Sequence, residues 1–124
     1  MSKAVSLVAV FKEELSVAFK LLCILLKMRQ RACITGSSMT PAFFPGEEVL
    51  YDPKAYQRRL PEVGDVVVAI HPNTTQKIIK RVTSVLEDGS CFLTGDNQEA
   101  STDSRSFGFV SLKHILGKVI CKFP

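Results

Sequence analysis

The sequence predicts a compact, mostly antiparallel β-fold that is preceded by an N-terminal amphipathic helix. Beyond residue 30, short runs rich in β-branched residues alternate with glycine and proline, a pattern typical of strands joined by turns. In the first thirty residues, apolar side chains recur instead at helical spacing. The chain has 124 residues, of which 46% are hydrophobic, so it is long enough for one domain with its own core. We therefore expect residues 1–30 to form the helix and residues 31–124 to form the folded domain.

The predicted helix covers roughly residues 4–28, with apolar positions at Val8, Phe11, Leu15, Ala18, Leu22 and Leu25. Lysines and glutamates divide it into apolar pieces much shorter than the about twenty residues that a membrane-spanning helix needs. No small-residue cleavage site follows a compact apolar core, which argues against a secretory signal. The apolar face could pack on the folded domain, lie on a membrane surface or dock a partner, and the sequence does not choose among these.

The predicted strands follow the helix with short connections. An extended segment over 32–35 comes first, and Glu87-Asp88-Gly89 predicts a hairpin turn. A short helix over 111–116 is expected to end at Gly117. The remaining strands are predicted at 48–51, 66–70, 77–86, 91–94 and 118–123.

Lys80 lies in the predicted strand over 77–86, on its more apolar face. Strand side chains alternate between faces, so Lys80 shares a face with Ile78 and Val82. An ordinary lysine is neutral in roughly one molecule in a few thousand at pH 7, and burial lowers the pKa because it disfavours the ammonium. A neutral amine can accept a proton from a nucleophile, so Lys80 is a candidate general base. The alternative is a lysine whose stem covers apolar surface while its ammonium reaches water.

A candidate nucleophile lies on a turn after the first extended segment. The sequence there is Gly36-Ser37-Ser38-Met39-Thr40-Pro41. Gly36 permits an unusual backbone turn, and Pro41 disfavours a helix through Thr40. Serine becomes a nucleophile when a neighbouring base accepts its proton, and serine–lysine pairs are a known form of this arrangement. The alternative is a serine that only makes turn hydrogen bonds.

A polar loop over 95–105 supplies a third group of candidate residues. Its hydroxyl groups could orient an amine, and Asp103 and Arg105 could form a pair that braces the loop. The alternative is an ordinary surface turn, because aspartate, asparagine, glycine and serine favour turns.

Together these segments resemble the signal peptidase I family of serine–lysine peptidases, in order and spacing, over about residues 34–109. The matching boxes are Ser38-Met39-x-Pro41, the strand over 64–68, Lys80-Arg81-Val82 and the loop over 95–105. The resemblance implies a signal-peptidase-like β-fold and a serine endopeptidase in which Ser38 attacks the scissile carbonyl and Lys80 is the general base. It also implies that Ser101 orients the lysine amine, while Asp103 and Arg105 hold the loop.

Two positions depart from the family's usual pattern. Some members carry a serine two residues before the nucleophile, where this chain has Gly36. Backbone N–H groups, chiefly that of Ser38, would then stabilise the oxyanion. Gly36, Ser37 and Met39 would form the segment beside which substrate adds as an extended strand. Gln98 stands where the family usually has arginine.

Within this family, the chain resembles the maturation proteases of nickel-type superoxide dismutase, which are short and lack a membrane anchor. The resemblance lies in residues 51–56, 71–72, 95–97, 101–108 and 123–124. It implies removal of a short N-terminal extension from the dismutase precursor. The alternatives are a conventional signal peptidase I that cleaves exported preproteins, a non-catalytic binding module with the same fold, and a self-cleaving repressor. The last requires a DNA-binding segment and an internal Ala-Gly site, and neither is apparent.

The composition predicts no cofactor and no nucleic-acid partner. The net charge of +4 is mild and indicates a solvated basic face. The two histidines are far apart in the sequence, so no metal site is expected. The cysteines form no CxxC pair and are expected to be buried thiols in a reducing cytosol; they are Cys23, Cys33, Cys91 and Cys121. We therefore expect a cytoplasmic peptidase that acts on a precursor protein, with peripheral membrane contact through the N-terminal helix as an open alternative.

Overall fold

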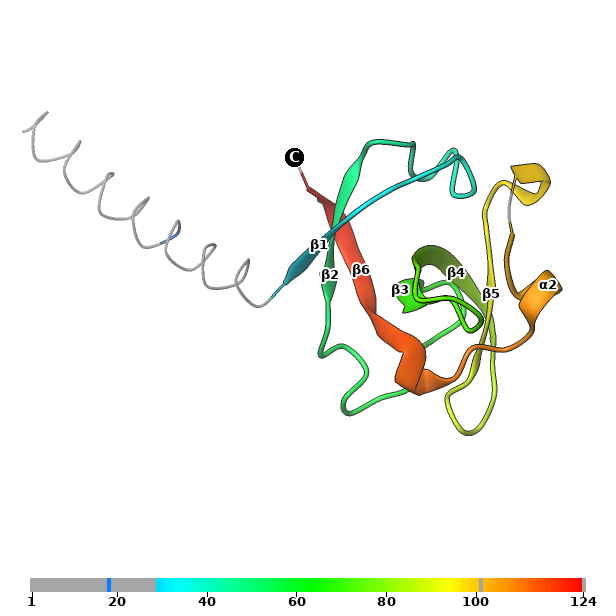
Figure 1. The fold of residues 1–124 in the computed structure, drawn as a ribbon. Helices are drawn as coiled ribbons and strands as arrows, with labels where there is room; N and C mark the ends of the chain where they lie inside the picture. The colour runs from blue at the N-terminus through cyan, green and yellow to red at the C-terminus, as the bar shows by residue number, and fades with distance from the viewer. Residues whose placement is uncertain (1–17, 19–28, 101, 124) are drawn as a thin grey trace, which may run out of the picture.

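The fold is mainly β in the part of the chain that the computed structural model describes, which is residue 18 and residues 29–100 and 102–123 (Figure 1). The strands are β1 (Gln30–Cys33), β2 (Glu48–Asp52), β3 (Val66–Ile70), β4 (Lys77–Val85), β5 (Cys91–Thr94) and β6 (Ile115–Phe123). Short helical turns lie between β5 and β6, namely η1 (Gln98–Ala100), α2 (Ser104–Phe107) and η2 (Leu112–His114).

The strands form one six-stranded sheet in the order β1-β2-β6-β3-β4-β5. Each neighbouring pair is antiparallel. The predicted fold class, mainly β and mostly antiparallel, is therefore confirmed. β3 and β5 have the predicted bounds, and β4 ends one residue earlier than predicted, because Leu86 already belongs to the hairpin turn and donates its N–H to the Ser90 carbonyl.

β3 lies inside the sheet between β6 and β4, and a hydrophobic cluster buries each of its two faces. Val66 and Val68 pack into a first hydrophobic cluster, whereas Val67 and Ala69 pack into a second. Consecutive side chains of a strand point to opposite faces, so burial on both sides requires a continuous apolar run. This explains why residues 66–70 lack the polar alternation of a half-exposed strand.

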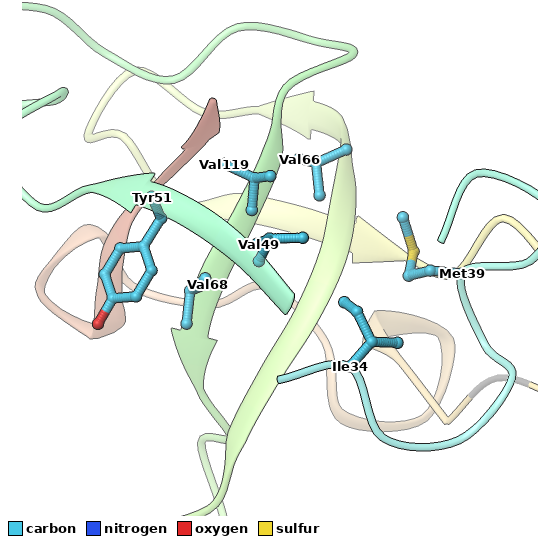
Figure 2. Packing of buried hydrophobic residues seen from close by; sticks show 7 residues of the cluster. All are labelled: Ile34, Met39, Val49, Tyr51, Val66, Val68 and Val119. Carbon is cyan, nitrogen blue, oxygen red and sulfur yellow. The ribbon is translucent and has the colours of Figure 1, made fainter. Parts of the chain in front are cut away.

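The first cluster reaches the segment that follows β1. Its members are Ile34, Met39, Val49, Tyr51, Val66, Val68 and Val119 (Figure 2). Ile34 and Met39 lie at one end of it and come from the segment that carries Ser38. The second cluster, on the other face of β3, contains Val67, Ala69, Val82, Cys91, Leu93 and Val110. The candidate nucleophile is thus attached to one cluster, and Val82 of the candidate lysine strand belongs to the other.

The predicted helix over 111–116 is wrong. Only the single turn η2 is helical, and β6 begins at Ile115. Gly117 does not end a helix, because it lies within β6 and faces the backbone of β2. A Cβ atom at this position would lie 2.3 Å from the backbone oxygen of Asp52. Glycine is required here by the close approach of a strand, which the local sequence does not reveal.

The expectation of buried thiols is wrong for two cysteines. Cys91 is buried, but Cys33 and Cys121 are exposed. Both thiols lie on the face of the sheet opposite the first cluster of buried residues. Cys33 alternates with Ala32 and Ile34, which pack on that cluster, and Cys121 pairs with Leu50, whose neighbours Val49 and Tyr51 belong to it. Cys23 and nearly all of the predicted N-terminal helix lie outside the described residues. Over the described ranges, no helix has the length and apolar character needed to cross a membrane.

Candidate active site

Ser38 lies on the turn between β1 and β2, which we call the serine turn (residues 34–40). Ile34 continues the pairing beyond β1, because its N–H donates to the Glu47 carbonyl at 2.8 Å. Ile34 and Met39 are 4% and 1% exposed, so the first cluster holds the turn on both sides of Ser38. Gly36 has a φ of 71°, in the left-handed region that glycine adopts most readily. Ser38 itself is half-buried.

Hydrogen bonds from a distant loop fix the backbone of the serine turn. The N–H of Asn97 donates to the Ser38 carbonyl at 2.8 Å. Its side-chain amide donates to the Ser37 carbonyl and to Oγ1 of Thr40, both at 3.2 Å. The Thr40 hydroxyl closes the turn by donating to the Ser37 carbonyl at 2.9 Å. In Figure 1 the yellow segment after β5 accordingly lies beside the segment after β1.

Lys80 projects from β4 into an apolar environment. Its side chain lies on the face of the second cluster, where Ile78 and Val82 flank it, and the residue is 5% exposed. Burial lowers the pKa of Lys80, the charge of Asp103 opposes this, and the charge of Arg105 lowers the pKa further. The amine therefore loses its proton more readily than that of an exposed lysine.

Arg81 connects the lysine strand to the loop after β5. Its Nε donates to Oδ1 of Asp96 at 2.8 Å and its Nη2 donates to Oδ2 at 2.9 Å. A bidentate pair of this kind fixes geometry as well as charge. Asn97 follows Asp96 directly, so the same loop holds both β4 and the serine turn. Arg81, Asp96 and Asn97 lie in the segments that resemble the family, but the sequence alone predicts no role for them. The local sequence indicates such a role only through Gly-Asp-Asn directly after a strand.

Asp103 braces the other end of this loop. It is fully buried and is the N-cap residue of α2, where it accepts a hydrogen bond from the Arg105 N–H at 3.1 Å. Its carboxylate also accepts from the Gly95 N–H at 3.0 Å and pairs with the Arg105 guanidinium at 2.9 and 2.8 Å. The ion pair expected between Asp103 and Arg105 is therefore present, and the hydrogen bond from the Gly95 N–H to Asp103 joins the two ends of the loop.

The loop contains two further positions of interest, Ser101 and Gln98. Ser101 lies outside the described residues, so its predicted contact with the lysine amine stays a prediction. Gln98 takes part through its backbone, because its carbonyl accepts from the Arg105 guanidinium at 3.3 Å. The departure from arginine at this position therefore leaves the contact with Arg105 in place.

Ser38 and Lys80 line the same pocket, which has a volume of about 360 Å³. It lies between β1 and the first residues of β4, and its lining consists of residues 31–35, Ser38, Met39 and 76–80. Gly36 and Ser37 belong to the serine turn but not to the lining. The fold thus brings the candidate nucleophile and the candidate base to one cavity, although 42 positions separate residues 38 and 80 in the sequence.

The pocket contains the groups that acyl transfer by serine and lysine requires. A serine hydroxyl is made nucleophilic by a neighbouring base, and an amine with a lowered pKa can serve as that base. Backbone N–H groups of a rigid turn can stabilise an oxyanion. Among the described residues, no three His, Cys, Asp or Glu side chains gather as metal ligands would.

Comparisons with known proteins agree on one family. The sequence profile of the family described as "Signal peptidase, peptidase S26" matches residues 7–85 and 83–123. The chain is 32% identical to the mitochondrial inner membrane protease subunit 1 of Schizosaccharomyces pombe, over 71% of this chain and 69% of that protein. It is 25% identical to the probable signal peptidase I-1 of Synechocystis sp., over 73% of this chain and 68% of that protein.

A shorter match extends to a third relative. The chain is 42% identical to the signal peptidase I of Buchnera aphidicola over 45 residues, which are 36% of this chain and 14% of that protein. It therefore spans about two thirds of two relatives and a small part of the third. Signal peptidases of this family are serine endopeptidases. The chain belongs to the signal peptidase family, peptidase S26.

Proposed function

We propose that this protein is a serine endopeptidase with a Ser38/Lys80 dyad that removes an N-terminal extension from a precursor protein. The observation that carries the proposal is the pocket whose wall contains both Ser38 and the almost fully buried Lys80. A general base must be neutral before it can accept a proton, and burial lowers the pKa of Lys80 in that direction. Family membership supports the same chemistry.

The proposed reaction proceeds in two halves. The neutral Lys80 amine accepts the Ser38 hydroxyl proton while the Ser38 oxygen bonds to the scissile carbonyl carbon, and the Ser38 N–H stabilises the oxyanion. The Lys80 ammonium then donates this proton to the leaving amine as the C–N bond breaks, which leaves an acyl-enzyme. Water adds to the ester with Lys80 again as the base, and the carboxylic acid product and the Ser38 hydroxyl are released.

Two strand edges beside the pocket support binding of the precursor as an extended strand. Among the described strands, β1 is at the edge of the sheet and pairs with β2 alone. β4 pairs with β5 only from Arg81 onward, so over the described residues no strand partner covers 77–80 on that side. Unpaired backbone groups of such edges can bind an added peptide strand. A precursor bound between them would pass Ser38 and Lys80.

For the precursor we propose nickel-type superoxide dismutase. The support is the resemblance of residues 51–56, 71–72, 95–97, 101–108 and 123–124 to the maturation proteases of that enzyme. We further propose that residues 31–124 form the catalytic domain, and that residues 1–30 form an amphipathic helix that is the candidate for peripheral membrane contact by a cytoplasmic enzyme. In this proposal Ser101, Asp103 and Arg105 position Lys80, while Gly36, Ser37 and Met39 shape the substrate strand.

The test is to incubate the purified protein with a nickel superoxide dismutase precursor and to identify the new N-terminus by mass spectrometry. We expect one defined cleavage by the wild type and none by Ser38→Ala or Lys80→Arg, each shown to be folded by circular dichroism. Arginine retains the positive charge but cannot lose its proton, so it cannot act as the base. Cleavage by a folded Lys80→Arg enzyme contradicts the proposed dyad.

A conventional signal peptidase I is the second candidate, favoured by the names of two of the matched relatives. It differs in its substrate, because exported preproteins are cleaved at a membrane. Membrane fractionation and cleavage of a preprotein in proteoliposomes distinguish the two. A non-catalytic binding module, the remaining alternative, predicts that a serine-directed acylating probe leaves Ser38 unlabelled.

A further inference from the structure

The pocket carries positive charge at the end away from Ser38 and Lys80. Arg31 of β1 and Lys77 of β4 both belong to its lining. Among the residues that the structure describes, no aspartate or glutamate belongs to the lining. Both strand segments run toward the Ser38–Lys80 end with increasing residue number, so Arg31 and Lys77 belong to the wall at the opposite end.

The position of Lys77 on β4 sets its distance from the scissile bond of a bound substrate. Lys77 precedes Lys80 by three residues, which is roughly 10 Å of strand. A peptide strand added beside β4 advances by the same rise per residue. A substrate side chain three or four residues from the scissile bond would therefore lie beside Lys77.

The two cations differ in their present partners. Arg31 forms an ion pair with Glu48 at 3.4 Å, and its guanidinium lies over the Phe123 ring at 4.5 Å from the centroid. Lys77 is exposed and has no carboxylate within ion-pair distance in the part of the chain that the structure describes. Lys77 is therefore available to a carboxylate of the substrate, whereas the charge of Arg31 is already engaged by Glu48.

We propose that this end of the pocket is a specificity site that binds an aspartate or glutamate of the precursor, three or four residues from the scissile bond, with Lys77 as its principal contact. The inference rests on the proposed peptidase function and adds a substrate class to it. A partly exposed ion pair contributes modestly, so this site selects among substrates and is not required for cleavage itself.

The test uses a library of synthetic ten-residue peptides, randomised at each position, with the products sequenced by mass spectrometry. For the wild type we expect acidic residues to be enriched about three- to tenfold at the third or fourth position from the cleaved bond. Lys77→Met should lose this enrichment. Lys77→Glu should reverse it, so that lysine and arginine are preferred at the same position.

Lys113→Glu is the matched control, because Lys113 is also an exposed lysine but lies on η2, outside the pocket lining. It should keep the wild-type profile. The inference is overturned if acidic residues are not enriched, if Lys77→Glu leaves the enrichment unchanged, or if Lys113→Glu alters it equally. Library cleavage that Ser38→Ala abolishes, but without acidic preference, removes only this inference. The absence of Ser38-dependent cleavage removes the proposed function as well.

Discussion

Lys80 and Lys118 occupy one cross-strand row of the sheet, on either side of Val67. Residues paired in this way project from the same face, so the two lysines begin from equivalent backbone positions. The Nζ of Lys118 lies 3.5 Å from Oδ1 of Asp65, and its side chain is 29% exposed. Lys80 is buried, and burial lowers its pKa. The same residue type in the same row thus has two electrostatic environments.

The carboxylate near each lysine explains much of the difference. Asp65 accepts hydrogen bonds from the Tyr56 hydroxyl at 2.8 Å and the Glu62 N–H at 3.1 Å. Desolvation raises the pKa of Asp65, but these donors and Lys118 outweigh it and lower the pKa overall, which keeps a carboxylate beside Lys118.

Asp103 is paired differently, because the Arg105 guanidinium binds its carboxylate on both oxygens. Arg105 itself lowers the pKa of Lys80, which opposes the effect of Asp103. Lys80 is buried, and the carboxylate near it is already paired to arginine, so the pKa of Lys80 is lowered as a general base requires. A more exposed lysine with its own carboxylate suits a structural ion pair.

Among the substitutions that test the difference between the Lys80 and Lys118 sites, Asp103→Ala should have the largest effect on stability. It removes the α2 cap, leaves the buried Gly95 N–H without this acceptor, and unpairs Arg105. We expect the free energy of unfolding to fall by about 3 kcal/mol, measured by urea denaturation. Asp65→Ala should cost less, because Asp65 is less buried. An equal or larger loss for Asp65→Ala contradicts the distinction between the two sites.

Lys80→Met should stabilise the fold while abolishing cleavage. We expect the free energy of unfolding to rise by about 2 kcal/mol at pH 7, because a buried amine is replaced by an apolar chain of similar length. The folded pKa of Lys80 lies below the unfolded one, so between them the unfolded state binds more protons and wild-type stability increases with pH. The advantage of methionine should therefore shrink as pH rises through that interval. Lys118→Met should give no such gain.

Arg105→Gln should change the pH dependence of cleavage. Removing the guanidinium charge raises the pKa of Lys80, because a repulsive charge is lost and Asp103 then favours the ammonium more strongly. The acid limb of the kcat/KM profile should move to higher pH, so that activity falls at pH 7 and recovers at alkaline pH. Lys118→Met should leave the limb in place. A loss that is equal at all pH values would indicate general structural damage instead.

Tyr56→Phe should have the smallest effect on stability, and it tests the surroundings of Lys118. It removes the hydroxyl that donates to Asp65 and leaves the ring in place. We expect a loss of about 1 kcal/mol in the free energy of unfolding, with kcat/KM unchanged. Thermal denaturation and the peptide library assay measure the two quantities. A large loss of activity would show that the two lysine sites are coupled.

Much of the architecture was predictable because it depends on short-range patterns. The apolar run over 66–70 and the turn at 87–89 can each be recognised from a few consecutive residues, and β3 has the predicted bounds. The start of β6 was missed, because the need for glycine at Gly117 comes from the backbone of Asp52 on another strand. The role of Asn97 was missed for the same reason, since its bonds reach the serine turn across about sixty residues of sequence.

The sequence by itself determined most of the strands and the kinds of candidate groups, a serine on a glycine-containing turn and a lysine within an apolar strand. Local pattern alone does not separate the two lysines, because Leu116 and Ile120 flank Lys118 much as Ile78 and Val82 flank Lys80. Only the tertiary structure decided that Ile120 is 47% exposed, whereas Val82 is fully buried. Desolvation depends on every segment that packs around a side chain, and for Lys80 the charges of Asp103 and Arg105 come from more than twenty residues away.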